Sequence, residues 1–258
     1  MRRFGRFSAI LSTLLALLTA SVGYVLQPDD RSALPADGDA PDVRIFLLGD
    51  SITGSTGCWR ARLWHELQDA DYTNIDFVGK RSGPDACGDG FDNDHAGFSG
   101  SRATRLAASQ RLPEWLDGDP ADVVMMHLGS NDIRHDRDAD EILAAYSVLV
   151  DQMRQHNPDI VILVAQPIPM TDTPMGKDCA SCPDRLDRLV EGIPFWAAAQ
   201  NTIASPVIVV DQADGFDAEV DTYDGLHSNE AGGAKIADHW YTALSGVLSR
   251  DAVTPADA

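Results

Sequence analysis

Three short runs in this 258-residue chain carry residue types that could together perform nucleophilic chemistry. Gly49-Asp50-Ser51 supplies a hydroxyl that becomes a nucleophile when a neighbouring base takes its proton. Asp224 and His227 stand close enough in sequence for a tight turn to hold them together. An aspartate fixes the imidazole tautomer in such a pair, and the imidazole can then face a serine. The run Gly129-Ser130-Asn131-Asp132 adds a third polar cluster.

Each cluster also has a purely structural interpretation. Ser51 alone could cap the turn that follows it. We predict that Asp50 and Asp132 brace loops by accepting hydrogen bonds from the backbone, and that His127 is a hydrogen-bonded core histidine. No metal site is predicted, because His65-Glu66 lacks a second histidine and the acidic stretches lack EF-hand spacing.

The elements that must position these clusters can be recognised by their hydrophobicity. Five apolar runs favour strands: Val43–Leu48, Ile75–Val78, Val123–Leu128, Ile160–Ala165 and Val207–Val210. Continuous hydrophobicity is typical of parallel strands buried on both faces. Helix-period segments separate or follow them: 59–68, 139–155, 185–203 and 230–248. The alternation predicts a three-layer α/β/α sandwich with a five-stranded parallel sheet, and such sheets bind ligands beyond their carboxyl ends.

The composition is that of a folded protein, with 44% hydrophobic and 23% charged residues. The formal net charge of -20 excludes a nucleic-acid partner bound through phosphates, and it disfavours anionic lipid surfaces. All but six of the 40 acidic residues are aspartate. Such a surface is consistent with salt adaptation or with biased genomic composition.

The N-terminus is predicted to be an export signal. In residues 1–26, basic residues directly precede an apolar run, as in a signal peptide. Cleavage after Gly23 would release the protein, whereas an uncleaved run is long enough to act as a membrane anchor. We predict a linker at 27–41, one domain at 42–250 and a disordered tail at 251–258. The protein should be a secreted or extracellular monomer whose only membrane contact is a retained anchor.

Export makes disulfides the expected state of the four cysteines. Cys179 and Cys182 form a C-x-x-C motif in a Pro/Gly-rich loop and should pair locally, which leaves Cys58 for Cys87. A four-cysteine zinc site is the alternative. A redox role is weaker, because the motif is not expected to open a helix after a strand.

Four residues in order match the pattern of the SGNH or GDSL hydrolase superfamily, which this chain resembles: Ser51, Gly100, Asn131 and His227. Longer stretches are similar to carbohydrate esterase family 3, the acetyl xylan esterase-like branch: 57–60, 75–79, 94–100 and 235–241. Two positions depart from that pattern, Ser228 in place of the usual Pro and Ala96 in place of a common Glu. The resemblance implies a flavodoxin-like SGNH hydrolase fold and no cofactor.

The resemblance also implies roles for individual residues. Ser51 would be the nucleophile, His227 the general base and then acid, and Asp224 the carboxylate that orients it. The oxyanion hole would comprise the backbone N–H groups of Ser51 and Gly100 and the side-chain amide of Asn131. The order Ser, Asp, His also occurs in α/β-hydrolases, but this sequence has no G-x-S-x-G motif.

Two further residues are candidates for substrate contact. Trp59 follows the nucleophile loop and could stack on a sugar, and His95 lies in a predicted loop. We therefore expect an exported serine esterase that removes acetyl groups from a polysaccharide such as xylan, or hydrolyses small acyl esters. The alternatives are a lipase or lysophospholipase and a non-catalytic carbohydrate-binding protein.

Overall fold

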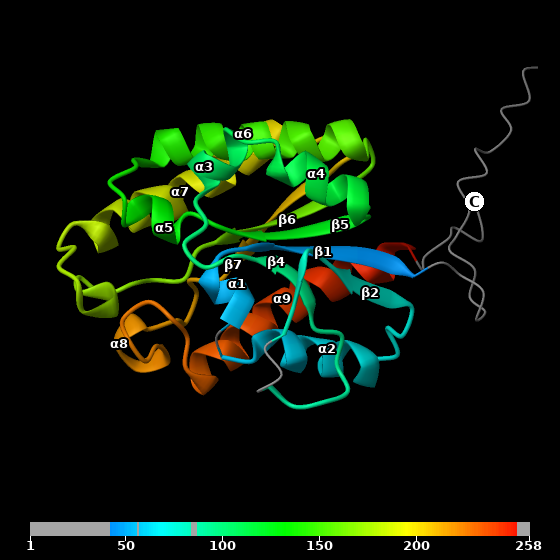
Figure 1. The fold of residues 1–258 in the computed structure, drawn as a ribbon, viewed down its shortest axis with the longest axis horizontal. Helices are drawn as coiled ribbons and strands as arrows, with labels where there is room; N and C mark the ends of the chain where they lie inside the picture. Colours follow the sequence, from blue (N-terminus) through cyan, green and yellow to red (C-terminus); the bar gives the residue numbers. More distant parts are fainter. Residues whose placement is uncertain (1–41, 56, 84–86, 252–258) are drawn as a thin grey trace, which may run out of the picture. The chain divides into compact units, whose positions relative to one another are not determined.

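The computed structural model describes residues 42–55, 57–83 and 87–251, which form a central sheet with helices on both faces (Figure 1). The predicted α/β/α sandwich is thereby confirmed. The predicted export segment at 1–26 and the linker at 27–41 lie outside the described residues. The same holds for the predicted tail at 251–258, except for Asp251, which is helical rather than part of a tail. Within the described ranges, no helix is long and apolar enough to cross a membrane.

All five predicted strands are present and lie in one sheet. They are β1 (Val43–Gly49), β2 (Ile75–Val78), β5 (Val123–His127), β6 (Val161–Gln166) and β7 (Val207–Asp211). Two further strands, β3 (Arg81–Ser82) and β4 (Asp94–Gly97), were not predicted. The sheet therefore has seven strands rather than five, in the order β3-β4-β1-β5-β6-β7 with β2 also paired to β1. Only the pair of β3 with β4 is antiparallel among the described strand pairs.

Strand β4 shares one edge of β1 with β2. The start of β1 pairs with β2, where Val43 is opposite Ile75, and its end pairs with β4, where Gly49 is opposite Gly97. A Cβ atom on Gly97 would lie 2.5 Å from the backbone nitrogen of Gly54, so glycine is needed for this close approach. The approach brings the segment that follows β4 next to the helix that begins at Ser51.

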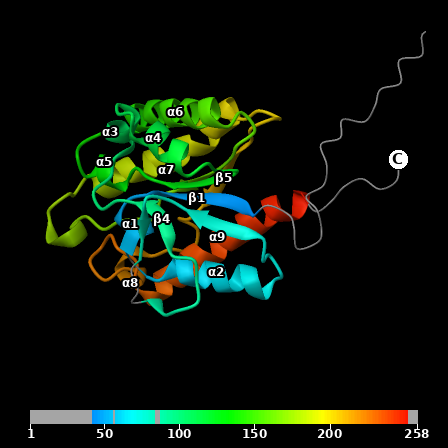
Figure 2. The same cartoon turned by 45° about the vertical axis from the view of Figure 1, so that its right-hand side comes forward.

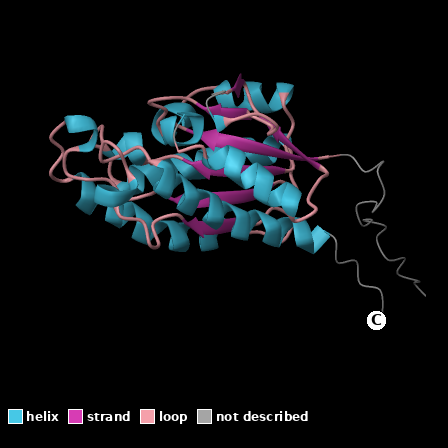
Figure 3. Cartoon of the chain, turned by 90° about the horizontal axis from the view of Figure 1, so that it is seen from below, coloured by secondary structure: helices cyan, strands magenta, loops and turns pink. Residues whose placement is uncertain are grey.

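The helices divide between the two faces of the sheet (Figures 1 and 2). One face carries α3 (Ala103–Ala107), α4 (Arg111–Gly118), α5 (Ser130–Ile133), α6 (Ala139–His156) and α7 (Cys182–Gln200). The other carries α1 (Ser51–Ser55), α2 (Trp59–Asp69), α8 (Ala218–Asp221) and α9 (Glu230–Asp251). The four long helices that the apolar periodicity predicted are α2, α6, α7 and α9. Figure 3, a view from below, shows helices covering the sheet.

Helix α6 illustrates how local sequence sets a boundary. The Asp138 side chain accepts a hydrogen bond from the Glu141 backbone N–H at 2.8 Å, and the Glu141 carboxylate accepts one from the Asp138 N–H at 3.2 Å. This capping box satisfies two of the N–H groups that a helix start leaves unpaired. The apolar stripe of α6, which includes Tyr146 and Leu149, is buried.

Polar residues gather where the strands end. Strand β1 passes into α1 through Asp50 alone, and β5 passes into α5 through Leu128 and Gly129. Helices α1, α5 and α8 lie at the same end of the sheet in both Figure 1 and Figure 2. The carboxyl edge of the sheet therefore carries the three runs singled out in the sequence.

As the sequence predicts, the C-x-x-C motif does not open a helix after a strand. Cys182 is the first residue of α7, so the motif does open a helix, although it follows the 3₁₀ turn η2 (Pro174–Gly176) rather than a strand. The Cα atoms of Cys179 and Cys182 are 5.2 Å apart, and those of Cys58 and Cys87 are 5.3 Å apart. Both separations suit a disulfide. The structure thus brings together the two pairs that the sequence predicts.

We predict that peptide mass mapping without reduction will show Cys58 linked to Cys87 and Cys179 linked to Cys182. The first bridge closes a segment with a sequence separation of 29 residues. In the chain-entropy model such a loop stabilises the fold by about 3–4 kcal/mol, so reduction should lower Tm. Four free thiols, or zinc bound to them, would contradict this prediction.

Candidate active site

The structure brings Ser51, His227 and Asp224 together in one chain of hydrogen bonds. Ser51 Oγ lies 2.9 Å from His227 Nε2, and His227 Nδ1 lies 2.8 Å from Asp224 Oδ2. Ser51 opens α1 directly after β1, whereas the other two lie in the turn between α8 and α9. All three residues lie at the carboxyl edge of the sheet. The arrangement can move a proton from the serine hydroxyl to the imidazole.

Asp224 is held in place by the backbone of its own turn. Its Oδ1 accepts hydrogen bonds from the N–H groups of Leu226 at 3.1 Å and His227 at 2.8 Å. Partial burial acts to raise the pKa of Asp224, but the hydrogen bonds from the ring and backbone of His227 outweigh it and lower that pKa. The carboxylate therefore stays ionised and accepts a hydrogen bond from the Nδ1–H group, which leaves Nε2 as an acceptor for the serine hydroxyl.

Asn131 lies on α5, and both its amide nitrogen and its amide oxygen take part in hydrogen bonds. Its Nδ2 donates to Asp50 Oδ2 at 2.9 Å, and its Oδ1 accepts from Arg134 Nη1 at 3.3 Å. An amide nitrogen carries two hydrogens, so one N–H of Nδ2 is left to donate to a third group. Asp50 directly precedes Ser51, and it therefore couples the position of this amide to the segment that carries the hydroxyl.

Gly100 follows β4 and is exposed, with a φ of 76°. That left-handed backbone conformation favours glycine, whereas a Cβ atom there would meet nothing within 4 Å. The segment is anchored by Phe98, whose ring stacks on Trp115 at 4.7 Å with Arg81 5.3 Å from its centroid. The reason for glycine at this position is thus its backbone conformation rather than lack of space within the protein.

Asp132 connects the Asn131 and Gly100 segments. Its carboxylate accepts hydrogen bonds from the backbone N–H groups of Ala103 at 2.7 Å and Thr104 at 3.0 Å, at the start of α3. Asp50 likewise accepts from the N–H of Ile52 at 2.8 Å. Both aspartates brace backbone, as the sequence predicted.

Burial gives Asp50 an unusual protonation equilibrium. It raises the pKa of Asp50 to about 6, even though the Ile52 N–H, the charge of His227 and the Asn131 amide act in the opposite direction. An unfolded aspartate has a pKa of about 4. The stability contributed by the protonated carboxyl is therefore fully present below pH 4 and is lost as the pH rises through 6.

We expect Asp50→Asn, which cannot titrate, to gain stability relative to the wild type by up to about 3 kcal/mol between pH 4 and pH 7. Urea unfolding of both proteins at the two pH values measures this difference. Asp187→Asn, at an exposed position of α7, is the matched control and should show no such gain. If the free energies of unfolding of Asp50→Asn and the wild type differ by the same amount at pH 4 and at pH 7, burial does not raise the pKa of Asp50.

Trp59 is not available to a substrate, contrary to the prediction from sequence. Its side chain is 2% exposed, and its ring stacks on Trp240 with centroids 6.4 Å apart. The indole N–H donates to the carbonyl of Ile52 at 2.8 Å. Trp59 thus supports the helix that begins at Ser51 from within the core.

The two histidines near the site are also buried. His95, predicted to contact substrate, lies in β4 with 1% exposure, and its Nδ1 accepts from the Gly97 N–H at 3.0 Å. Burial, with the charges of Arg60 and Arg81, lowers the pKa of His95 to about 4, so the ring is neutral and structural. His127 is buried as predicted, but neither ring nitrogen has a hydrogen-bond partner among the described residues.

Tyr223 is an exposed residue at the site that the sequence analysis missed. Its ring stacks on the imidazole of His227 with centroids 5.7 Å apart and an interplanar angle of 17°, and it is 65% exposed. The one feature of the sequence that could have indicated Tyr223 is its position directly before Asp224. Nothing else in the sequence distinguishes it from the other tyrosines.

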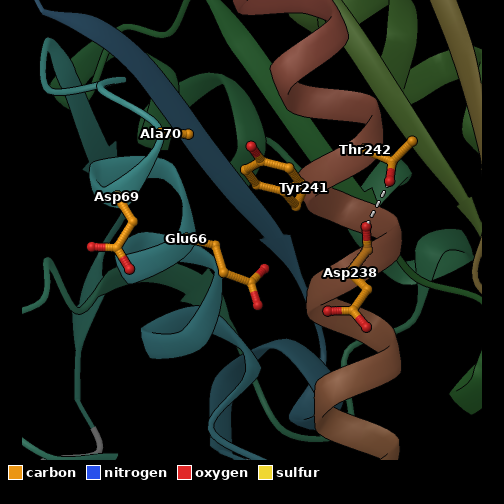
Figure 4. A pocket seen from close by; sticks show the side chains of 6 residues that line it. All are labelled: Glu66, Asp69, Ala70, Asp238, Tyr241 and Thr242. Atoms are coloured by element: carbon orange, nitrogen blue, oxygen red, sulfur yellow. Dashed lines mark hydrogen bonds between the residues drawn. The ribbon is translucent and has the colours of Figure 1, made fainter.

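A separate acidic cleft of about 450 Å³ lies between α2 and α9. Figure 4 shows Glu66 and Asp69 on α2 and Asp238, Tyr241 and Thr242 on α9. Arg62 pairs with Glu66 at 2.8 Å and with Asp238 at 3.5 Å. No group of three metal-ligating side chains is arranged around an ion site anywhere in the described part of the chain. None of the residues of the Ser51 site lines this cleft.

Comparison with known proteins identifies the family. The model of the GDSL-like lipase/acylhydrolase family matches residues 47–235. The structure of a carbohydrate esterase family 3 from Talaromyces cellulolyticus is 31% identical, with a TM-score of 0.73 over 82% of this chain and 100% of that one. An acetyl esterase crystallised with an acetate ion is 30% identical, with a TM-score of 0.73 over 81% of this chain and 99% of that one.

A multidomain esterase of Ruminococcus flavefaciens is 26% identical over 262 residues. The match covers 92% of this chain and 33% of that protein, so the chain spans a third of the length of this relative. The resemblance inferred from the four motif residues is confirmed by the family match and by the solved structures. The chain is therefore a carboxylic ester hydrolase and belongs to the GDSL-like lipase/acylhydrolase family.

Proposed function

We propose that the protein is an exported serine esterase that removes acetyl groups from a polysaccharide such as xylan through an acyl-enzyme on Ser51. The observation that carries this proposal is the hydrogen-bonded chain from Ser51 Oγ through the His227 ring to Asp224, with distances of 2.9 and 2.8 Å. The Asp224 end of this chain is fixed by the backbone N–H of His227, and the Asp50 carboxylate braces the turn around Ser51 by accepting from the Ile52 N–H, so the geometry is preorganised for catalysis.

In the proposed mechanism, Ser51 Oγ attacks the ester carbonyl while His227 Nε2 takes its proton. The negative charge on the carbonyl oxygen is met by the N–H groups of Ser51 and Gly100 and by the remaining N–H of Asn131. The tetrahedral intermediate then collapses with cleavage of its bond to the sugar oxygen, His227 gives the proton to that oxygen so that the sugar leaves as an alcohol, and the acetyl group remains on Ser51. Water attacks this acyl-enzyme by the same route, with His227 as base, and acetate leaves.

The substrate class is proposed from two sources. Solved structures at about 30% identity are those of an acetyl esterase and a family 3 carbohydrate esterase. Tyr223 presents an exposed ring face beside His227, and the apolar face of a sugar ring packs well on an aromatic ring. Export is proposed from the basic and apolar residues at 1–26.

One observation favours the alternative, a lipase-type acylhydrolase. Val220 and Tyr223 lie three residues apart on the segment that leads to His227, and each is 65% exposed. Together they offer apolar surface that could hold a longer acyl chain. Burial of each additional CH₂ would then contribute about 0.8 kcal/mol to binding.

Esters of increasing chain length separate the two functions. We expect kcat/KM to fall from p-nitrophenyl acetate to butyrate and to be barely measurable for octanoate, and acetate to be released from acetylated xylan. Ser51→Ala is the blank for each assay. Preference for octanoate together with no acetate from acetylated xylan would reject the deacetylase and favour the lipase-type enzyme.

A further inference from the structure

A second cleft, of about 600 Å³, lies between α3 and the first half of α6. Arg102, Arg105 and Arg137 line it together with a single carboxylate, that of Glu141. Its other lining residues are mostly apolar and include Val148, which is 43% exposed. The cleft therefore carries a net positive charge, whereas the formal charge of the full chain is -20.

Two of the three guanidinium groups have no ion-pair partner in the part of the chain that the structure describes. Arg137 Nη1 pairs with Glu141 Oε1 at 3.0 Å. No ion pair or side-chain hydrogen bond involves Arg102 or Arg105 within residues 42–55, 57–83 and 87–251. Arg102 is half-buried and Arg105 is exposed. A planar guanidinium without a partner binds a carboxylate through two parallel hydrogen bonds.

The cleft adjoins the proposed catalytic site through two loops. Arg102 is two residues from Gly100, so their Cα atoms are at most about 7 Å apart. Arg137 follows α5, the helix that carries Asn131. Asp132 ties these loops together, because it accepts from the N–H groups that follow Arg102. A polymer bound with an acetyl group at Ser51 would extend over this cleft with its neighbouring sugars.

We propose that the arginine cleft binds the carboxylates of an acidic polysaccharide, that is, uronate residues near the acetylated sugar. This inference rests on the proposed function and specifies its substrate. A pyranose ring would lie against the alanine and valine side chains of the cleft while its carboxylate pairs with Arg102 or Arg105. Without such a cleft, a protein of this net charge would repel a polyanion and favour a neutral polymer.

A matched pair of polymers tests the preference. A glucuronoxylan and the same polymer with its carboxylates reduced to alcohols are both chemically acetylated to the same degree. We expect kcat/KM for acetate release to be roughly tenfold higher on the uronate polymer, as one charge-assisted pair would give. Raising NaCl from about 0.1 to 1 M should remove most of the preference, because the screening length falls to about 3 Å.

Variants then assign the preference to the cleft. In Arg105→Gln and in the double variant with Arg102→Gln, the ratio of kcat/KM on the uronate polymer to that on p-nitrophenyl acetate should fall about tenfold. Arg188→Gln, at an exposed position of α7 outside the cleft, makes the same charge change and should leave this ratio at the wild-type value. An equal fall in Arg188→Gln would assign the effect to net charge and overturn the proposal.

The failure of this inference is distinguishable from the failure of the proposed function. Equal rates on the two polymers, with acetate released from both, would overturn the cleft's role and leave the deacetylase standing. If neither polymer is deacetylated although p-nitrophenyl acetate is hydrolysed, the polysaccharide function fails. Calorimetric titration of Ser51→Ala with deacetylated, uronate-bearing xylo-oligosaccharides still tests the cleft, and no binding would overturn it.

Discussion

Ser51→Ala and His227→Ala are each expected to lower kcat by about 10⁵- to 10⁶-fold, and the double variant should be little worse than either. In the proposed mechanism the hydroxyl and the imidazole, 2.9 Å apart, act as one unit, because the nucleophile is weak without its base and the base has no function without the nucleophile. Initial rates on p-nitrophenyl acetate measure this effect, and circular dichroism confirms that each variant is folded.

Matched substitutions away from the site provide the control. Ser245→Ala on α9 and His65→Ala on α2 remove the same groups from partly or fully exposed positions. Both should hydrolyse the ester at the wild-type rate. Turnover near the wild-type level in a folded Ser51→Ala protein would disprove the proposed mechanism. Strictly additive losses in the double variant would show that the two residues act separately.

The strands were predictable because burial on both faces leaves a clear mark in the sequence. The residues Val123–Met126 of β5, for example, are all apolar, and no helix of ordinary amphipathic pattern resembles such a run. Strand β4 carries no such mark, since its residues Asp94–Gly97 are polar or small. What makes it a strand is pairing with the end of β1 and the glycine contact between Gly54 and Gly97, which are tertiary interactions.

The proposed catalytic residues were predictable for a different reason. Ser51, Asp224 and His227 lie at strand ends or in tight turns, where short motifs reflect local geometry. Substrate contacts depend instead on which side chains reach the surface. Trp59 is close to Ser51 in sequence but is buried against Trp240, so sequence proximity was a poor guide to exposure.

Of the two hydrogen-bond contacts that Asp50 makes at the site, only one could be predicted from the sequence. The sequence indicated that Asp50 would bind backbone, and it does so at Ile52. It could not show that the second carboxylate oxygen holds Asn131, which is 81 residues away. The contact exists because β1 and β5 are neighbours in the sheet, and strand order is decided by packing rather than by local pattern.

That contact sets the last prediction, for Asn131→Ala. The loss of one proposed oxyanion donor should lower kcat by roughly 10²- to 10³-fold and change KM less, because such a donor meets charge that develops only after attack. Asp50 binds one N–H of the Asn131 amide and Arg134 binds its oxygen. These two contacts fix the direction in which the remaining N–H points.

The test is the separation of kcat from KM on p-nitrophenyl acetate. Asn157→Ala is the matched control, because Asn157 donates to the carbonyl of Ala121 at 2.9 Å and lies at the end of α6. It should cost stability but leave kcat unchanged. If Asn131→Ala raises KM and leaves kcat intact, the amide binds the substrate in its ground state. The oxyanion hole would then have only the backbone N–H groups of Ser51 and Gly100.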